Sequence, residues 1–439
     1  MRSRALRLAS LFCATAGTLV LCSPKATRAQ LIDQYLNTAI PGFDVQPGVT
    51  VASRLRPEYD YPGIRVGDFI ILPELSESAG YDSNVTGTEP AQGSPFLETQ
   101  ATVRAVSDWG RDSLGGGITI DNNSYLDLPR QSYTNWIATL GGTYDIDRDV
   151  LSIGYAHLNL NQTSRDLDVP QLDSPVAYRI NDLHASYKAA LSALSLQPGI
   201  EITGFDYDNG TVQGVPYVQS YRDRVVFTPS LTASYEFAPL RSLVLVVRDS
   251  DAHYTNEPTT MATQNFNDIS VLAGVNYDTG GQIRLRALVG YETRHFVSEQ
   301  YATISAPIVE ASAVWTPTGL TTITGTVARY IEDSASDTTV GYTETAAKLA
   351  VDHEYLRNVL LNATAGFYTD SYQQNQANQS YVTLGAGVTW LINRHMRLVG
   401  RYEFSSRQSN ASQAELGIGQ TVGGSYSENR FLLQLKIGL

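Results

Sequence analysis

Charged side chains recur at every second position in the segment 282–296. Arg284, Arg286, Glu292 and Arg294 alternate there with apolar residues. Successive side chains of a β-strand point to opposite faces, so an extended chain would gather these charges on one face and the apolar residues on the other. A helical period of 3.6 residues does not produce this separation. The segment is therefore predicted to be a strand with one charged and one apolar face.

The same two-faced pattern recurs elsewhere, and a row of charges on a strand can do two kinds of chemistry. It can form cross-strand ion pairs that stabilise a polar interior, or it can form charged rings that order a polar solute in a pore. The residue types alone leave both interpretations open. The candidate pore-lining residues are Arg284, Arg286, Glu292, Arg294, Glu344, Lys348, Arg397, Arg401, Glu403 and Lys436.

No motif of an enzyme, a metal site or a cofactor site stands out in the sequence. The six histidines form neither H-x-x-x-H nor H-E-x-x-H, and no G-x-S-x-G nucleophile signature is present. Gly115–Gly117 lacks the Lys-Ser/Thr pair of a phosphate-binding loop and is better explained by close packing within a strand. We expect no enzymatic activity, no metal and no cofactor. The loop acids Asp166, Asp168 and Asp173 leave open either divalent cation binding or a solvated acidic rim.

Composition narrows the class of protein. Of the 439 residues, 42% are hydrophobic and only 17% are charged, whereas a soluble protein usually has about 25% charged residues. The chain carries 31 Lys and Arg against 44 Asp and Glu, a net charge of −13. This acidic balance argues against a nucleic-acid partner, because phosphate binding needs clustered basic side chains. The apolar content is too high for a disordered chain.

Residues 1–29 have the three parts of a cleavable secretory signal peptide. Three arginines form a basic start, an apolar core follows, and Thr27–Ala29 offers small residues before a cleavage point. Cleavage would remove five basic residues and no acid, so the mature chain would carry −18, and it would also remove Cys13 and Cys22, the two cysteines. An exported, thiol-free and acidic chain rich in Tyr and Gly suits the outer membrane of a Gram-negative bacterium.

Runs of alternating polar and apolar residues fill the rest of the chain. Residues 30–69, punctuated by Pro and Gly, are predicted to be a short periplasmic N-terminal extension, and residues 70–439 a single domain of about 18 strands. Two runs, 302–315 and 321–331, lack a clean separation into two faces. The strands are expected to start near Ile70, Leu97, Asp112, Tyr133, Asp149, Pro175, Ser195, Arg222, Arg241, Phe266, Gln282, Tyr301, Leu320, Tyr342, Asn358, Ser380, Arg394 and Tyr426.

The connections between these strands alternate in length, which is typical of a transmembrane β-barrel. Tight turns such as 146–148 and 238–240 alternate with longer polar loops such as 163–174 and 406–425. Outer-membrane barrels have short periplasmic turns and long outer loops. Hydrocarbon requires every backbone N–H and C=O to pair internally, and a closed antiparallel sheet meets this requirement. The fold class is therefore predicted to be all-β, with a soluble periplasmic or secreted β-sandwich or propeller as the alternative.

Residues 54–84 resemble the opening segment of a family of β-barrel porins from Gram-negative outer membranes. The residues that carry the resemblance are Arg56, Pro57, Tyr59, Asp60, Gly63, Arg65, Gly67, Phe69, Tyr81, Asp82 and Asn84. The resemblance implies a barrel of roughly 18 strands, and some members look like conduits for exported surface polysaccharide beside a periplasmic polysaccharide-export protein. The chain ends in Leu439, whereas barrel assembly signals commonly end in Phe.

We therefore expect an outer-membrane conduit for hydrophilic material that is involved in export of surface or extracellular polysaccharide. The resemblance supports export, while barrel physics alone supports passive diffusion of small polar solutes. A non-transporting surface adhesin or structural barrel is a third reading, and an enzyme comes last. The expected partners are outer-membrane lipid and lipopolysaccharide, the barrel assembly machinery and the periplasmic export protein.

Overall fold

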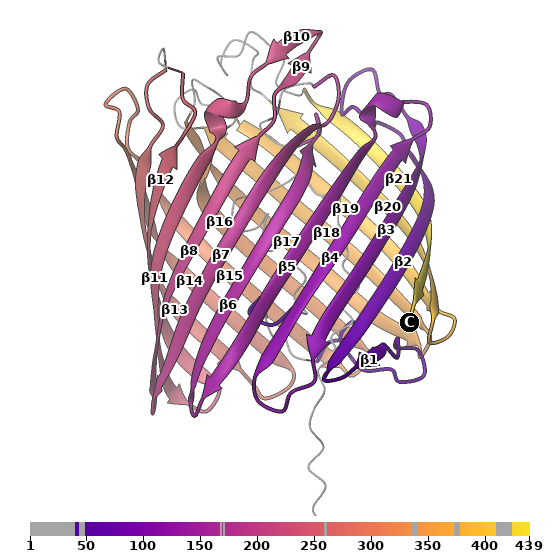
Figure 1. The fold of residues 1–439 in the computed structure, drawn as a ribbon, viewed down its shortest axis with the longest axis vertical. Coiled ribbons are helices and arrows are strands. Elements are labelled where there is room, and N and C mark those ends of the chain that lie inside the picture. The colour runs from indigo at the N-terminus through magenta and orange to yellow at the C-terminus, as the bar shows by residue number, and fades with distance from the viewer. Residues whose placement is uncertain are drawn as a thin grey trace, which may run out of the picture.

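The alternating segments of the sequence form eighteen long strands in a closed antiparallel barrel (Figure 1). The computed structural model describes residues 40–43, 49–166, 169, 172–258, 261–334, 340–372, 378–409 and 424–439. The predicted signal peptide, residues 1–29, and Asp168 lie outside the described residues. Within them the all-β prediction is confirmed, and each predicted strand start lies within three residues of an observed one.

The strands follow one another around the barrel in chain order, and two small pairings are added to them. The barrel strands are β2 (Phe69–Asp82), β3 (Ser94–Ser107), β4 (Ser113–Tyr125), β5 (Tyr133–Ile146), β6 (Asp149–Gln162), β7 (Val176–Leu191), β8 (Leu194–Tyr207), β11 (Arg224–Ala238), β12 (Arg241–Tyr254), β13 (Phe266–Asp278), β14 (Ile283–Phe296), β15 (Ile304–Thr318), β16 (Thr321–Asp333), β17 (Gly341–Leu356), β18 (Val359–Tyr372), β19 (Asn378–Leu391), β20 (Met396–Ser409) and β21 (Tyr426–Gly438). The additions are β1 (Ile64–Val66), which pairs with β2, and the hairpin of β9 (Gly210–Val212) and β10 (Val215–Tyr217).

Pairing between the first and last long strands closes the barrel. β2 pairs with β3 on one side and with β21 on the other, from Glu74 opposite Gly438 to Asp82 opposite Arg430. β21 therefore leaves the first residues of β2 without a partner on that side. Strand β1 turns back and pairs with those residues. The seam thus has no long open edge, which a strand in hydrocarbon could not tolerate.

Side chains of each strand alternate between the lipid-facing wall and the lumen. In β19, Leu384 and Trp390 are each 48% exposed, whereas Tyr381 on the other face is 2% exposed. The exposed set is apolar and the enclosed set is largely polar along β19 and β21. An apolar outer wall around a polar interior accounts for the low charged fraction of the chain.

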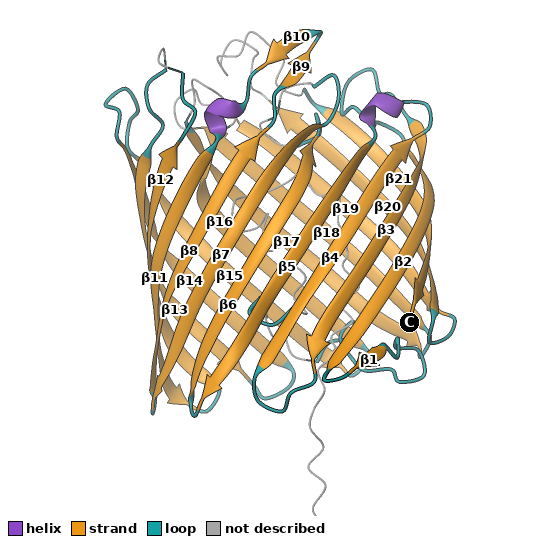
Figure 2. Cartoon of the chain, viewed as in Figure 1, coloured by secondary structure: helices purple, strands orange, loops and turns teal. Residues whose placement is uncertain are grey.

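The two ends of the barrel differ in the length of their connections. Two residues join β5 to β6, whereas residues 163–175 join β6 to β7. The long loops also carry the β9–β10 hairpin and two short 3₁₀-helices, η1 (Pro129–Gln131) and η2 (Ser220–Arg222) (Figure 2). The C-terminus lies at the short-turn end, which corresponds to the periplasmic side (Figure 1). In the described part of the chain, no helix is long and apolar enough to cross a membrane.

Strands β15 and β16 explain the two runs without a clean alternation. They pair only from Val309 and Arg329 toward the periplasmic end. Beyond that point the end of β16 leaves β15 and leans over the lumen, so that Ile331 packs against Ile304 and Ala306. Both faces of this end of β16 are covered by protein. The alternation of apolar and polar residues, which separates a lipid-facing side from a lumen-facing side, is therefore not expected there.

The outer wall gives a direct test of orientation in the membrane. Val289 lies in the middle of β14 and is 64% exposed on the lipid-facing side. Val289→Arg is expected to destabilise the barrel by about 2–4 kcal/mol, because it places a cation near the bilayer midplane. Urea titration of the barrel folded into lipid vesicles measures this loss. Val289→Leu is the matched uncharged control and should change stability little; equal losses in both variants would contradict the orientation.

Candidate pore and its charged lining

The ten candidate pore-lining residues lie on the inner face of the wall. In β14 the four candidates share their face with Leu288, which is 0% exposed, while Val289 faces outward. The same alternation places Glu344 and Lys348 of β17 inside, together with the candidates of β20 and β21. An eighteen-stranded barrel is wide enough to hold an aqueous channel. The candidates differ, however, in how far they are buried and in what they contact.

Two of the candidates belong to a bridge across the extracellular mouth. Arg294 is 3% exposed and donates to Asp268 at 2.9 Å and to Asp333 at 2.5 Å. Glu292 accepts a hydrogen bond from the backbone N–H of Ile331 at 3.3 Å. Asp333 ends the strand that leans inward, and it also pairs with Arg224 of β11 at 2.8 Å. One carboxylate therefore joins β16 to β14 and β11 over the lumen.

A second bridge comes from the loop between β6 and β7. Arg165 reaches away from its own strands and pairs with Asp82 of β2 at 2.8 Å and with Glu428 of β21 at 2.6 Å. Arg407 of β20 donates to the backbone carbonyls of Arg165 and Asp166, at 3.5 and 3.3 Å. Asp82 is 0% exposed. The loop is thus held inside the barrel mouth by charge-assisted hydrogen bonds, which are stronger than hydrogen bonds between neutral groups.

Sequence reasoning did not single out Arg165, Arg224, Asp333 or Arg407 as site residues. Arg165 lies in a polar loop whose composition resembles that of any exposed loop. The partners of Arg165 are 83 and 263 residues away along the chain. The spacing of residues within the loop therefore gives no indication of these partners. Arg407 could have been found, because it continues the parity of Arg401 and Glu403 on β20.

Further into the barrel, several charges on the inner wall are paired with other inner-wall charges. Arg248 of β12 donates to Glu310 of β15 at 2.5 Å. On β20, Arg401 lies 3.6 Å from Glu403. The remaining mid-wall and periplasmic contacts of the candidates are Arg286 with Asn276 at 3.2 Å, Lys436 with Glu74 at 3.4 Å, Arg284 with Asp278 at 2.8 Å, and Lys348 at 5.5 Å from the ring centre of Tyr368. Some candidates therefore have ion-pair partners and others contact amide or aromatic groups, while Arg284, with 36% of its side chain exposed, is open to water.

Glu344 lies in a row of polar side chains near the mouth. It stands directly opposite Asp370 of β18, which in turn stands opposite Gln379 of β19. All three are at most 1% exposed. Among the residues that the structure describes, no group of three or more His, Cys, Asp or Glu side chains is placed to hold a metal ion.

The family motif divides between the two ends of β2. At the mouth, Asp82 accepts from the backbone N–H of Asn84 at 2.9 Å, and the Asn84 amide donates to the backbone carbonyl of Ser427 across the seam at 3.2 Å. Tyr81 is 48% exposed on the outer wall. These contacts fix the extracellular end of the closure and present one carboxylate of the Arg165 bridge.

The earlier part of the motif lies at the periplasmic end. Arg56 pairs with Glu354 of β17 at 2.7 Å, and Asp60 lies 3.7 Å from Arg397 of β20. Arg397 also donates to the backbone carbonyl of Tyr59 at 3.3 Å. The remaining motif residues are Pro57, whose carbonyl accepts from Arg394 at 2.8 Å, Gly63 and Gly67, whose φ angles of 71° and 60° shape the hairpin of β1, Arg65, which pairs with Asp108 at 2.5 Å, and Phe69, which begins β2.

Comparison with known families decides the class of barrel. Residues 56–435 match the model of the family described as "Putative beta-barrel porin 2". The chain belongs to this porin family. The match covers all eighteen strands, apart from the last residues of β21, and it begins at Arg56 of the motif. No curated protein compared with the chain matches it.

Solved structures with a related barrel come from outer-membrane porins. OccK2 (OpdF) of Pseudomonas aeruginosa is 12% identical, with a TM-score of 0.45, and the match covers 85% of this chain and 98% of that one. A BenF-like porin of Pseudomonas fluorescens Pf-5 is 11% identical, with a TM-score of 0.45 and coverage of 85% and 100%. OccAB3 of Acinetobacter baumannii is also 11% identical, with a TM-score of 0.44 and coverage of 85% and 100%.

Family membership places the protein in the outer membrane of a Gram-negative bacterium. Porins are channels and not enzymes. The expectation of polysaccharide export finds no support in these comparisons, and the alternative of a diffusion porin fits the family better.

The Arg165 bridge predicts a large effect of a single substitution. Arg165→Met leaves the buried carboxylates of Asp82 and Glu428 without their cation, and breaking a buried ion pair from one side costs about 3–5 kcal/mol. Urea unfolding of the reconstituted porin measures this loss. Asp82→Asn and Glu428→Gln, added to Arg165→Met, should restore most of the stability because no unpaired charge remains.

Arg179→Met is the matched control for this experiment. Arg179 pairs with Asp208 at 2.9 Å, but the two side chains are 44% and 50% exposed. Exposed pairs contribute about 0–1 kcal/mol. If both methionine variants lost the same stability, the Arg165 bridge would not hold the loop.

The loop that carries Arg165 is also expected to respond to pH. Hydrogen bonds from the Gly214 backbone N–H, the Thr211 hydroxyl and the Gln213 N–H hold the pKa of Asp173 below its usual value. Stabilisation from this contact is present above the usual pKa and is lost as pH falls through the lowered one. Protection of the Gly214 amide against hydrogen exchange should therefore be lost as the pH falls through the lowered pKa of Asp173. In Asp173→Asn the exchange should already be fast at neutral pH and should lack this acid-dependent step.

Proposed function

We propose that this porin is a passive channel for small polar solutes and ions across the outer membrane. The observation that carries the proposal is the pair of ion-paired bridges, at Arg165 and at Asp333, above a lumen lined with charged side chains. The family match to porins supports the same conclusion. Passage would depend on diffusion, with the lining setting which solutes enter most readily.

The bridges favour small solutes over a polymer. Arg165 joins the β6–β7 loop to β2 and β21, and Asp333 joins the inward end of β16 to β11. Both bridges are built from side chains that are at most 9% exposed, so their charged groups are buried and held in fixed positions. A polysaccharide chain needs a wider opening than a small solute does, and both bridges narrow the opening at the mouth.

The lining also supports a preference among ions. The porin has more Asp and Glu than Lys and Arg as a whole, and a net negative charge concentrates cations by its electrostatic potential. Arg284 and Arg401 are inner-wall cations with 36% and 17% of their side chains exposed, which places their charge within reach of lumen water. These two residues therefore act against the cation preference that the carboxylates produce.

The proposal includes the partners that any such barrel needs. Insertion would depend on the barrel assembly machinery, and the outer wall would contact lipid and lipopolysaccharide. The proposal does not require the periplasmic polysaccharide-export protein expected from the sequence.

Conductance measurements test the proposed function directly. The purified porin in a planar bilayer should show steady open conductance, and liposomes that contain it should swell in monosaccharide faster than in a large oligosaccharide. A barrel without ion conductance and without uptake of small sugars would overturn the proposal. Uptake of long polysaccharide at the rate of monosaccharide would favour export instead.

Substitution of the exposed lining arginines should change ion selectivity. In Arg284→Ala and Arg401→Ala the reversal potential in a salt gradient should shift toward greater cation preference, because each variant removes a positive charge from the lumen. Arg179→Ala is the control, since its partner Asp208 lies beyond the end of β8 at the outer rim. Unchanged selectivity in the two lumen variants would remove these arginines from the solute path.

A further inference from the structure

Residues 40–43 of the N-terminal extension lie inside the barrel against its inner wall. Ile40 is 0% exposed and Phe43 is 9% exposed. They pack into one cluster with lumen-facing residues of β6 and β7, including Leu158 and Ile180. The inner wall of this sector is apolar. Residues 40–43 thus lie against an apolar surface inside the channel.

Glycines on the inner wall make room for this segment. Gly115, Gly141 and Gly154 lie on β4, β5 and β6 in the periplasmic half of the barrel. A Cβ at Gly115 would lie 2.7 Å from Cδ of Pro41, and one at Gly141 would lie 2.2 Å from the Pro41 carbonyl oxygen. At Gly154 an added Cβ would lie 2.8 Å from the Phe43 ring. The bare backbone of three adjacent strands therefore forms a cradle that any side chain would fill.

His184 of β7 completes the cradle. Its Nε2 donates to the backbone carbonyl of Gly42 at 3.1 Å, and its ring meets the Phe43 ring edge to face at 4.6 Å. The other ring nitrogen of His184 lies 3.0 Å from Asp182. Asp182 thus fixes the orientation of the His184 ring, and the ring binds the Gly42 carbonyl through one hydrogen bond.

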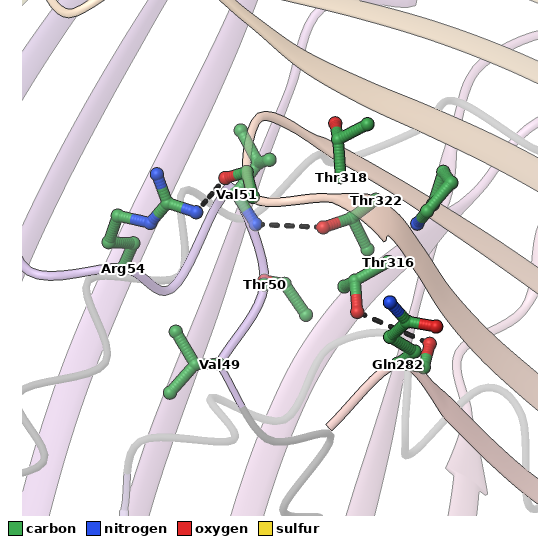
Figure 3. Close-up of a pocket in the computed structure, with 10 residues that line it drawn as sticks. Val49, Thr50, Val51, Arg54, Gln282, Thr316, Thr318 and Thr322 are labelled. Atoms are coloured by element: carbon green, nitrogen blue, oxygen red, sulfur yellow. Dashed lines mark hydrogen bonds between the residues drawn. The ribbon is translucent and has the colours of Figure 1, made fainter. Parts of the chain in front are cut away.

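The following part of the extension is bound to the opposite wall. The backbone N–H of Val51 donates to the Thr322 hydroxyl at 2.9 Å (Figure 3). Arg56 pairs with Glu354 at 2.7 Å and donates to the Val51 carbonyl at 2.9 Å. These partners lie on β16 and β17, and at least seven strands separate them from β6 in either direction around the barrel. Two stretches that are five residues apart in the sequence therefore seat on opposite sides of the lumen.

A cavity lies beneath the second stretch. It has a volume of about 240 Å³ and is lined by Val49–Val51 and Arg54 of the extension and by the turns at Gln282 and at Thr316–Gly319, and Arg54 donates to the Gly319 carbonyl beside it (Figure 3). Several of its lining residues are threonines whose hydroxyls could accommodate water. The second stretch is thus bound through Val51 and Arg54, and the cavity leaves part of its surface unpacked at the periplasmic end.

We propose that residues 40–43 and 49–61 act as an internal strap that partly closes the periplasmic end of the channel, and that release of residues 40–43 from the glycine cradle opens it. The Arg56–Glu354 ion pair and the Arg56 hydrogen bond to the Val51 carbonyl attach the strap on the other side of the lumen. The occupant of the cradle is thus the chain's own segment Ile40–Phe43. The proposal rests on the proposed channel function.

Filling the cradle tests the strap. Gly115→Ala with Gly141→Ala places two methyl groups where Pro41 lies, and single-channel conductance should rise about twofold or more, because conductance follows the open cross-section. Gly116→Ala is the control on the same strand but the opposite face, where the nearest atom to the new Cβ is 3.1 Å away. A deletion of residues 31–48 should give the same rise even if the double variant folds poorly.

A reversible cross-link separates the strap from the channel itself. Ile40→Cys and Gly117→Cys bring two thiols close together without filling the cradle, because a Cβ at Gly117 would lie at an ordinary contact distance of 3.5 Å from Cδ1 of Ile40. The mature chain is predicted to hold no other cysteine. Oxidised channels should show low, constant conductance that rises when a reductant is added, whereas Ile40→Cys alone should not respond.

The outcomes distinguish the two proposals. Conducting channels whose conductance is the same with the disulfide formed, with it reduced and after the deletion would overturn the strap and leave the channel function intact. Absence of conductance in every variant, the deletion included, would overturn the channel function and the strap with it.

Discussion

Internal pairing of every backbone N–H and C=O is the constraint on which the rest of this structure depends. Hydrocarbon offers no hydrogen bonds, so the sheet has to close on itself, and it does so where β21 meets β2. Closure divides all side chains into an outer and an inner set by parity alone. The apolar outer set and the charged inner set are consequences of that division, and so is the hairpin of β1, which covers the part of β2 that β21 does not reach.

The inner set faces a second constraint, because charges enclosed by the wall require partners. The pairs Arg248–Glu310 and Arg401–Glu403 satisfy this constraint within the wall itself. At the mouth, Arg165 and Asp333 meet it by drawing a loop and a strand end across the lumen. Buried pairs of this kind contribute little net stability, since desolvation offsets much of the attraction. What they contribute is position: they decide where the loops lie and therefore how wide the channel mouth is.

The sequence predicted the parts of the structure that depend on local periodicity. Alternation identified the strands, the inner placement of residues such as Arg284 and the two kinds of connection. It was uninformative for β15 and β16, because the end of β16 leaves the wall and Ile331 is buried among protein on both sides. It also gave no partner for Arg165, since the ion pairs of that residue join segments far apart in the chain. The seat of Ile40 was out of reach for the same reason, as single glycines on three strands create it.

The N-terminal motif now has a physical explanation that its residue types did not provide. Arg56 and Asp60 hold the chain to β17 and β20 before it turns through Gly63 and Gly67 into the first strands. The family match begins at Arg56, so this attachment belongs to the part of the chain shared with the family. The segment in the glycine cradle precedes that part. The wall closes through β2 and β21 whether or not the cradle is filled. The segment in the cradle can therefore change the opening of the channel without any change in the wall or in the attachment at Arg56.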